Sequence, residues 1–147
     1  MIKVNSFYPL ILDAFKENKT FSFPINGSSM RPMLKSLDIV TIKKIDELKK
    51  GDIVFFKRLD NSFVLHRIRN IKNDIYYIVG DHQTKIELVN KDQLIGKVIN
   101  YKKKDKDKIY NLKGVRYKFY KLLVRIKFIR FIFSHIYKWL KKDIVLY

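Results

Sequence analysis

The feature that most constrains the fold is a series of β-rich runs separated by turn signals. Between residues 38 and 99, apolar and β-branched stretches recur at short intervals, and Gly-Asp, Asp-Asn or Asn-Asp pairs lie between several of them. Strands are expected at 21–25, 38–42, 53–56, 63–68, 75–79 and 93–99. Short strands joined by such turns favour a mainly β fold, built as a compact antiparallel sheet or partial barrel.

Helical patterns flank this β-rich region. Apolar residues at helical spacing predict a short amphipathic helix over 5–17. The run Lys-Lys-Lys-Asp-Lys-Asp-Lys at 102–108 indicates a charged linker, and the pattern over 112–142 is helical again. We therefore predict a β-rich domain over 1–101, a linker over 102–108 and a basic amphipathic helical tail over 109–147.

The positive charge of the chain is concentrated in this tail. The formal net charge of the 147 residues is +18. Residues 1–100 hold 17 Lys/Arg against 11 Asp/Glu, whereas residues 101–147 hold 15 against 3. A basic tail of this kind points to anionic lipid, nucleic acid or an acidic partner.

The tail also separates its basic residues from its apolar ones. In an α-helix over 126–142, basic residues gather on one face, and aromatic and aliphatic residues on the other. The residues expected to bind a membrane are Lys127, Arg130, Phe133, Lys138, Trp139 and Lys141. Such a helix is typical of a membrane interface, so an anionic membrane surface is an expected partner. Alternatively, the apolar face packs on the β-rich domain or on a second copy. Nucleic acid is less favoured because no recognised binding motif accompanies the charge.

Composition excludes several kinds of site. The chain has no cysteine, which excludes a disulfide framework, a cysteine nucleophile and thiolate-rich zinc sites. Its three histidines are scattered, so neither a metal nor a cofactor is expected. No secretory signal is visible at the amino terminus, and no segment reaches the roughly 18 apolar residues of a membrane span. We therefore expect a cytoplasmic protein that associates peripherally with the membrane.

The segment 26–34, Asn-Gly-Ser-Ser-Met-Arg-Pro-Met-Leu, is the strongest candidate for chemistry. Gly27 allows the backbone to bend and another chain to approach closely. Met30 and the apolar residues after it can fix the segment on a hydrophobic surface. Ser29 would then lie at a strand-to-turn junction with its hydroxyl exposed, as a nucleophile requires. The alternative is a polar turn before a short apolar segment.

A serine nucleophile needs a base within hydrogen-bond reach. His66 is the best candidate because it lies on an apolar strand that would fix the orientation of its ring, although it could equally be a half-buried structural histidine. A third group should orient the base, and the choices are Asp81, at a strand end beside a glycine, and Glu87, six residues later. Either carboxylate could instead belong to the surface.

The order of these pieces is more specific than any one of them. Ser-Met-Arg-Pro, Gly-Asp-Ile-Val-Phe-Phe, Val-Leu-His-Arg-Ile, Val-Gly-Asp and Ile-Gly-Lys-Val follow one another within residues 22–100. This series resembles the signal peptidase I and LexA-like serine peptidase superfamily. The resemblance implies that Ser29 is the nucleophile. It also implies that His66 occupies the position at which most members have a lysine base, as in the endoplasmic-reticulum and archaeal type of signal peptidase.

The resemblance extends to the groups around this pair. It implies that Glu87 is the acid of the site and that Asp81 is the aspartate of the Gly-Asp box. The substrate or oxyanion residues are Gly27, Ser28 and Met30. Some members place an oxyanion-binding hydroxyl two residues before the nucleophile, where this chain has Gly27. Oxyanion binding would then depend on backbone N–H groups, chiefly that of Ser29.

Two hypotheses on function follow. The first is a serine endopeptidase that cleaves a leader or signal segment from a peptide or precursor protein by a Ser–His mechanism. The second is a catalytically inactive peptidase fold that binds peptides or docks on a membrane, which the missing hydroxyl and the altered Gly-Asp box motivate. The sequence does not indicate an oligomeric state.

Overall fold

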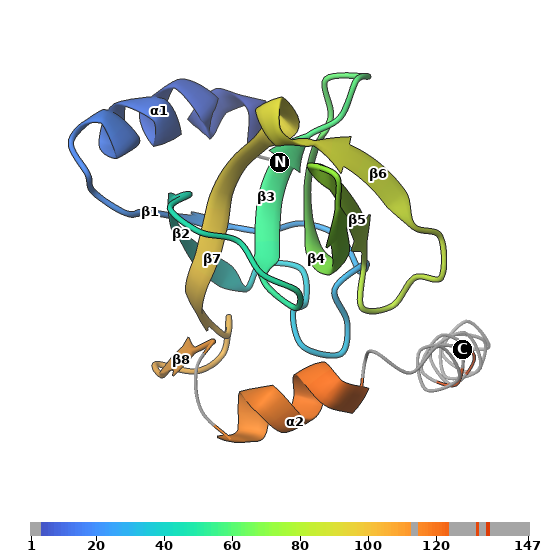
Figure 1. Ribbon diagram of the computed structural model, residues 1–147. Helices are drawn as coiled ribbons and strands as arrows, with labels where there is room; N and C mark the ends of the chain where they lie inside the picture. Colours follow the sequence, from blue (N-terminus) through green and yellow to red (C-terminus); the bar gives the residue numbers. More distant parts are fainter. Residues whose placement is uncertain (1–3, 113–114, 124–131, 133–134, 136–147) are drawn as a thin grey trace.

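The computed structural model describes residues 4–112, 115–123, 132 and 135 (Figure 1). Eight strands form one sheet in which every pairing is antiparallel. The strands are β1 (Phe21–Pro24), β2 (Ile39–Lys44), β3 (Ile53–Lys57), β4 (Phe63–Lys72), β5 (Ile75–Val79), β6 (Glu87–Asn90), β7 (Leu94–Lys102) and β8 (Ile109–Asn111). The predicted mainly β fold is confirmed.

The order of strands in the sheet is β1-β2-β7-β3-β4-β5-β6, and β8 pairs with β7. The late strand β7 therefore lies between β2 and β3 and joins the two halves of the sheet. The pairings of β7 with β2 and with β3 each contain a register shift, between Thr41 and Ile42 on β2 and between Phe55 and Phe56 on β3. Such irregularities bend and twist a strand locally, which suits the strongly curled sheet in Figure 1.

Two hydrophobic clusters hold the sheet together. The first combines residues of β1, β2, β3 and β7 with the segment after β1 and the first helix, and the second lies between β3, β4, β5 and β6. Strand β3 supplies both clusters, and Ile53, Val54, Phe55 and Phe56 are each at most 2% exposed. A strand covered on both faces is expected to be a continuous apolar run, and the sequence of this strand is one.

Helices lie at two ends of the sheet (Figure 1). A 3-10 turn, η1 (Val4–Phe7), leads into α1 (Tyr8–Lys16), which buries Ile11 and Phe15 against the first cluster. A second 3-10 turn, η2 (Lys91–Gln93), precedes β7. Helix α2 (Val115–Leu123) lies at the other end, within the predicted helical region.

The predicted linker forms the loop between β7 and β8. Lys102 ends β7, and Ile109 pairs with it at the start of β8. Within this loop, Lys103 binds the buried Asp38 carboxylate at 2.9 Å, and the backbone N–H of Lys104 donates to the same side chain at 3.1 Å. Residues on both sides of the predicted boundary therefore belong to one sheet, and the division into a domain and a tail stays a prediction.

Candidate active site

Ser29 lies in the turn that connects β1 and β2, where the sequence predicts it. The backbone N–H of Leu34 donates to the Met30 carbonyl at 2.9 Å, and that of Arg31 donates to the Ser28 carbonyl at 3.1 Å. Met30 and Leu34 are both buried in the first hydrophobic cluster. These contacts fix the turn on both sides of Ser29, while Ser29 itself stays half-buried and Ser28 is exposed.

Gly27 precedes this turn with a φ of +108°, a backbone conformation that L side chains rarely adopt. A Cβ atom at this position would have no atom within 4 Å. The glycine is therefore required for the bend of the chain, and its surroundings are open. Gly27 lines the same cavity as Ser29, so the predicted substrate position faces available space.

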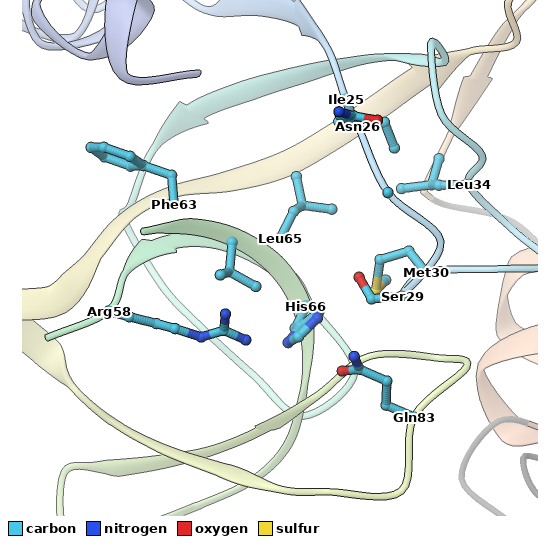
Figure 2. A pocket seen from close by; sticks show the side chains of 12 residues that line it. Ile25, Asn26, Ser29, Met30, Leu34, Arg58, Phe63, Leu65, His66 and Gln83 are labelled. Atoms are coloured by element: carbon cyan, nitrogen blue, oxygen red, sulfur yellow. The ribbon is translucent and has the colours of Figure 1, made fainter. Parts of the chain in front are cut away.

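The cavity beside Ser29 has a volume of about 230 Å³. His66, Arg58 and Gln83 also line it, and Figure 2 shows His66 and Gln83 closer than Arg58 to Ser29. Its apolar wall consists of Ile25, Met30, Leu34, Phe63, Val64 and Leu65. Among the described residues that line the cavity there is no lysine. His66 is therefore the only one of them that is suited to act as a general base.

Strand pairing brings the predicted acid to the predicted base. His66 is a buried residue of β4, and Glu87 is the first residue of β6. Between them, Ile78 of β5 pairs with Ile68 on one side and with Glu87 on the other. As a result, the His66 Nδ1 atom lies 3.0 Å from Glu87 Oε1. The carboxylate lies off the direction of the ring N–H, so this is a close contact without the alignment of a good hydrogen bond.

Glu87 is also held by Arg58, a residue that the sequence analysis did not single out. The Arg58 Nε atom donates to Glu87 Oε2 at 2.5 Å, and Nη2 donates to Oε1 at 2.7 Å. This two-point contact lowers the pKa of the Glu87 carboxyl and keeps it ionised. The sequence offered no signal for Arg58, because an arginine after a buried strand is an ordinary surface residue.

The pKa of His66 is lowered from its ordinary value of 6.5. Burial is the main cause, because it disfavours the charged imidazolium. The charge of Glu87 acts in the opposite direction, and that of Arg58 lowers the pKa further. His66 is therefore neutral at pH 7, as a general base must be.

Ser29 and His66 share the cavity but, within the described residues, their side chains are not hydrogen-bonded to each other. The two residues lie close together, since one Cβ position at Gly80 would be near both the Ser29 carbonyl oxygen and His66 Nε2 (Figure 2). Catalytic hydrogen bonds are often long or poorly aligned in unliganded sites and tighten when substrate binds. The backbone N–H of Ser29 likewise has no acceptor among the described residues, whereas the Ser29 carbonyl accepts from the His82 N–H at 2.9 Å.

Gly80 allows the Ser29 turn and His66 to lie close together. A Cβ atom at Gly80 would lie 2.6 Å from the Ser29 carbonyl oxygen and 3.1 Å from His66 Nε2. It would also lie 2.9 Å from Gln83 Oε1. The glycine of the Val-Gly-Asp segment therefore lies between the serine turn and the histidine, and it leaves no space for a side chain.

Gly80→Ala is therefore expected to lower the rate of any Ser29-dependent reaction by about 100-fold, because the Ser29 backbone must move to admit the methyl group. The measurement is the rate of Ser29 labelling by a serine-directed electrophile. Gly27→Ala is a useful comparison, since its added methyl group meets no atom and its effect should come from backbone strain alone. An unchanged rate in Gly80→Ala would show that the approach of these two segments is unimportant.

Asp81 occupies a different environment from Glu87. Its carboxylate accepts two hydrogen bonds from the buried Arg67 guanidinium, each of 2.7 Å, and one from the Tyr120 hydroxyl at 2.9 Å. Asp81 itself is only 2% exposed. Of the two carboxylates that the sequence left open, Glu87 lies beside His66, and Asp81 lies in a buried pair with Arg67. The catalytic role of each residue stays a prediction.

The predicted membrane-binding residues Lys127, Arg130, Phe133, Lys138, Trp139 and Lys141 lie outside the residues that the structure describes. Over the described ranges, no helix has the length and apolar character needed to cross a membrane. In the same part of the chain, histidines and carboxylates do not gather in a group of three or more that could hold a metal ion.

The fold and the site together define a class of protein. An antiparallel β domain presents a serine on a turn and a histidine on a neighbouring strand to one cavity, which is the arrangement of a serine-peptidase-type site. Residues 2–99 match the profile of the Peptidase S24-like family, and the chain belongs to this family. A search among curated proteins found no match. Membership confirms the predicted signal peptidase I and LexA-like superfamily and supports a peptidase-type function.

Proposed function

We propose that this protein is a serine endopeptidase with a Ser–His mechanism. The proposal rests on the arrangement around one cavity. Ser29 and His66 line this cavity, and Glu87 Oε1 lies 3.0 Å from His66 Nδ1. A nucleophile, a neutral base and an ionised acid in this order are the parts of an acyl-transfer site.

In the proposed reaction, Ser29 Oγ attacks the peptide carbonyl while His66 Nε2 takes its proton. The carbonyl oxygen becomes an oxyanion, which the backbone N–H of Ser29 stabilises by donating to it. The C–N bond then breaks, and His66 returns the proton to the leaving amine. Water attacks the acyl group on Ser29, with His66 again as the base, and releases the acid. Glu87 stabilises the positive imidazolium that forms in both steps.

The shape of the site supports an extended peptide as substrate. Ile25, Leu34, Phe63 and Leu65 line the cavity and provide an apolar surface for a substrate side chain. Strand β1 is the outermost strand at one edge of the sheet, and the chain continues from it directly into the Ser29 turn. A peptide that pairs with the outer edge of β1 would therefore pass Ser29 in an extended form.

We propose a precursor peptide or protein from which a leader or signal segment is removed, as in the signal peptidases that the sequence resembles. The basic residues of the tail would bring the enzyme to an anionic membrane surface from the cytoplasmic side.

A second candidate function is peptide binding without cleavage. It is favoured by the absence of a hydroxyl at Gly27 and by the off-line contact between His66 and Glu87. Reactivity of Ser29 separates the two functions, because an inactive fold would not activate this hydroxyl toward an electrophile.

The pH dependence of the reaction tests the identity of the base. Because the pKa of His66 lies below 6.5, the rate of Ser29 labelling is expected to rise through an acid limb centred below pH 6.5 and to level off by neutrality. A lysine base, even with a lowered pKa, would leave the rate still rising at about pH 8. A profile that rises only above neutrality would therefore contradict the Ser–His mechanism.

Arg58→Gln provides a second test of the same assignment. Removing this charge relieves a cause of the lowered pKa of His66, so the acid limb should move to higher pH. Lys57→Gln is the matched control, since it removes a charge from the adjacent residue without touching the two-point contact with Glu87. An acid limb that moves equally in both variants would show that only the overall charge matters.

A further inference from the structure

The buried Arg67–Asp81 pair connects helix α2 to the candidate active site. Both side chains are almost completely buried, at 4% and 2% exposure. A buried ion pair is maintained only where further hydrogen bonds satisfy its remaining polar atoms. Here those hydrogen bonds come from three separate parts of the chain.

Two tyrosines of α2 provide the first set of contacts. The Tyr120 hydroxyl donates to Asp81 Oδ2 at 2.9 Å. Arg67 Nη1 donates to the Tyr117 hydroxyl at 2.8 Å, and that hydroxyl donates to the Gly51 carbonyl at 3.1 Å. The Arg67 guanidinium also lies 5.6 Å from the centre of each tyrosine ring. Helix α2 therefore covers the pair with both hydroxyls and both ring faces.

The pair is in turn joined to three segments of the site: strand β4, the segment of Gly80 and the serine turn. Arg67 follows His66 directly on β4, and Asp81 follows Gly80, the glycine between Ser29 and His66. In addition, Arg67 Nη2 lies 3.6 Å from Met33 Sδ in the turn that carries Ser29. Any displacement of the pair would therefore be transmitted to His66, to Gly80 and to the serine turn.

We propose that Tyr117 and Tyr120 are positioning residues of the active site: through the Arg67–Asp81 pair, they hold His66 and Gly80 against the Ser29 turn. Helix α2 is then part of the catalytic unit, although neither tyrosine lines the cavity that Ser29 and His66 share. This inference rests on the proposed peptidase function and extends it to α2.

The test compares Tyr120→Phe, Tyr117→Phe and the double variant with wild type. Each substitution removes one hydroxyl and keeps the ring. Tyr110→Phe is the matched control: Tyr110 lines a cavity together with Tyr117 and Tyr120, but its ring stacks on Tyr101 at 5.1 Å, and its hydroxyl is not among the described groups that bind Arg67 or Asp81. Two quantities are measured with a fluorophosphonate probe: the limiting rate constant of Ser29 labelling and the probe concentration at half-saturation. The His66 imidazole resonance, assigned by its loss in His66→Gln, is recorded by NMR in parallel.

We expect the limiting rate constant to fall by about tenfold or more in Tyr120→Phe and further in the double variant, with little change in half-saturation. The His66 resonance should shift in the same variants, and Tyr110→Phe should match wild type in both measurements. A rate constant and a resonance that stay at their wild-type values in the double variant would overturn the inference. If wild type itself does not react, the proposed function fails, and the NMR shift alone decides whether α2 positions His66.

Discussion

Ser29→Ala is expected to lower peptide cleavage by about a thousandfold or more, since it removes the nucleophile and with it the covalent step. The variant should keep the stability of wild type, because Ser29 is half-buried and its backbone contacts remain. The measurement is the initial rate of cleavage of a peptide mixture, with product ends identified by mass spectrometry. Ser36→Ala is the control, because it removes a hydroxyl from the same loop, where Ser36 binds Asn26 at 2.7 Å.

His66→Gln should cause a loss of the same order as Ser29→Ala, and the double variant should lose little more, because the two residues act as a unit. His82→Gln provides the comparison for loss of an imidazole, since His82 contacts the site through its backbone N–H. Cleavage that survives Ser29→Ala but is lost in His82→Gln would contradict the proposed assignment.

Asp81→Asn is expected to destabilise the fold by about 3 kcal/mol or more, because it leaves the Arg67 guanidinium buried without its counter-charge. Urea unfolding of wild type and variant measures the change. Replacing both partners by apolar residues, in Arg67→Met with Asp81→Leu, should restore a large part of the stability.

Asp107→Asn is the matched control for this experiment. Asp107 also pairs with a basic residue, Lys102, but it lies at the surface with its side chain 97% exposed. Its substitution should leave the urea midpoint close to that of wild type. If Asp81→Asn is no more destabilising than this surface change, the buried pair does not hold the structure together. Helix α2 would then lack the connection proposed for it.

The sequence predicted the parts of this fold that have a strong local signal. The β3 run of Ile53 to Phe56 is continuous and apolar because it is covered on both faces, and its burial follows from that pattern. The serine turn was also predictable, since its apolar residues Met30, Met33 and Leu34 are buried as expected. Strands β6 and β8 were missed because each has only three or four residues and at most one buried side chain.

The site was predictable in its residue types but only in part in its contacts. From the residues alone, sequence analysis left both Asp81 and Glu87 open, because both follow β5 and their spacing does not show which carboxylate reaches His66; only the family resemblance favoured Glu87. The distinction depends on β6. This strand pairs with β5, and the pairing brings Glu87 into contact with His66. Arg58 and the α2 tyrosines act over distances in sequence that no local pattern records.

Mass spectrometry of the intact protein after treatment with a fluorophosphonate tests the central claim most directly. A Ser–His mechanism predicts one adduct, located on Ser29 by peptide mapping, and its absence from Ser29→Ala and His66→Gln under the same conditions. An unmodified wild-type protein that is shown to be folded, or an adduct on another residue, would contradict an activated Ser29–His66 pair.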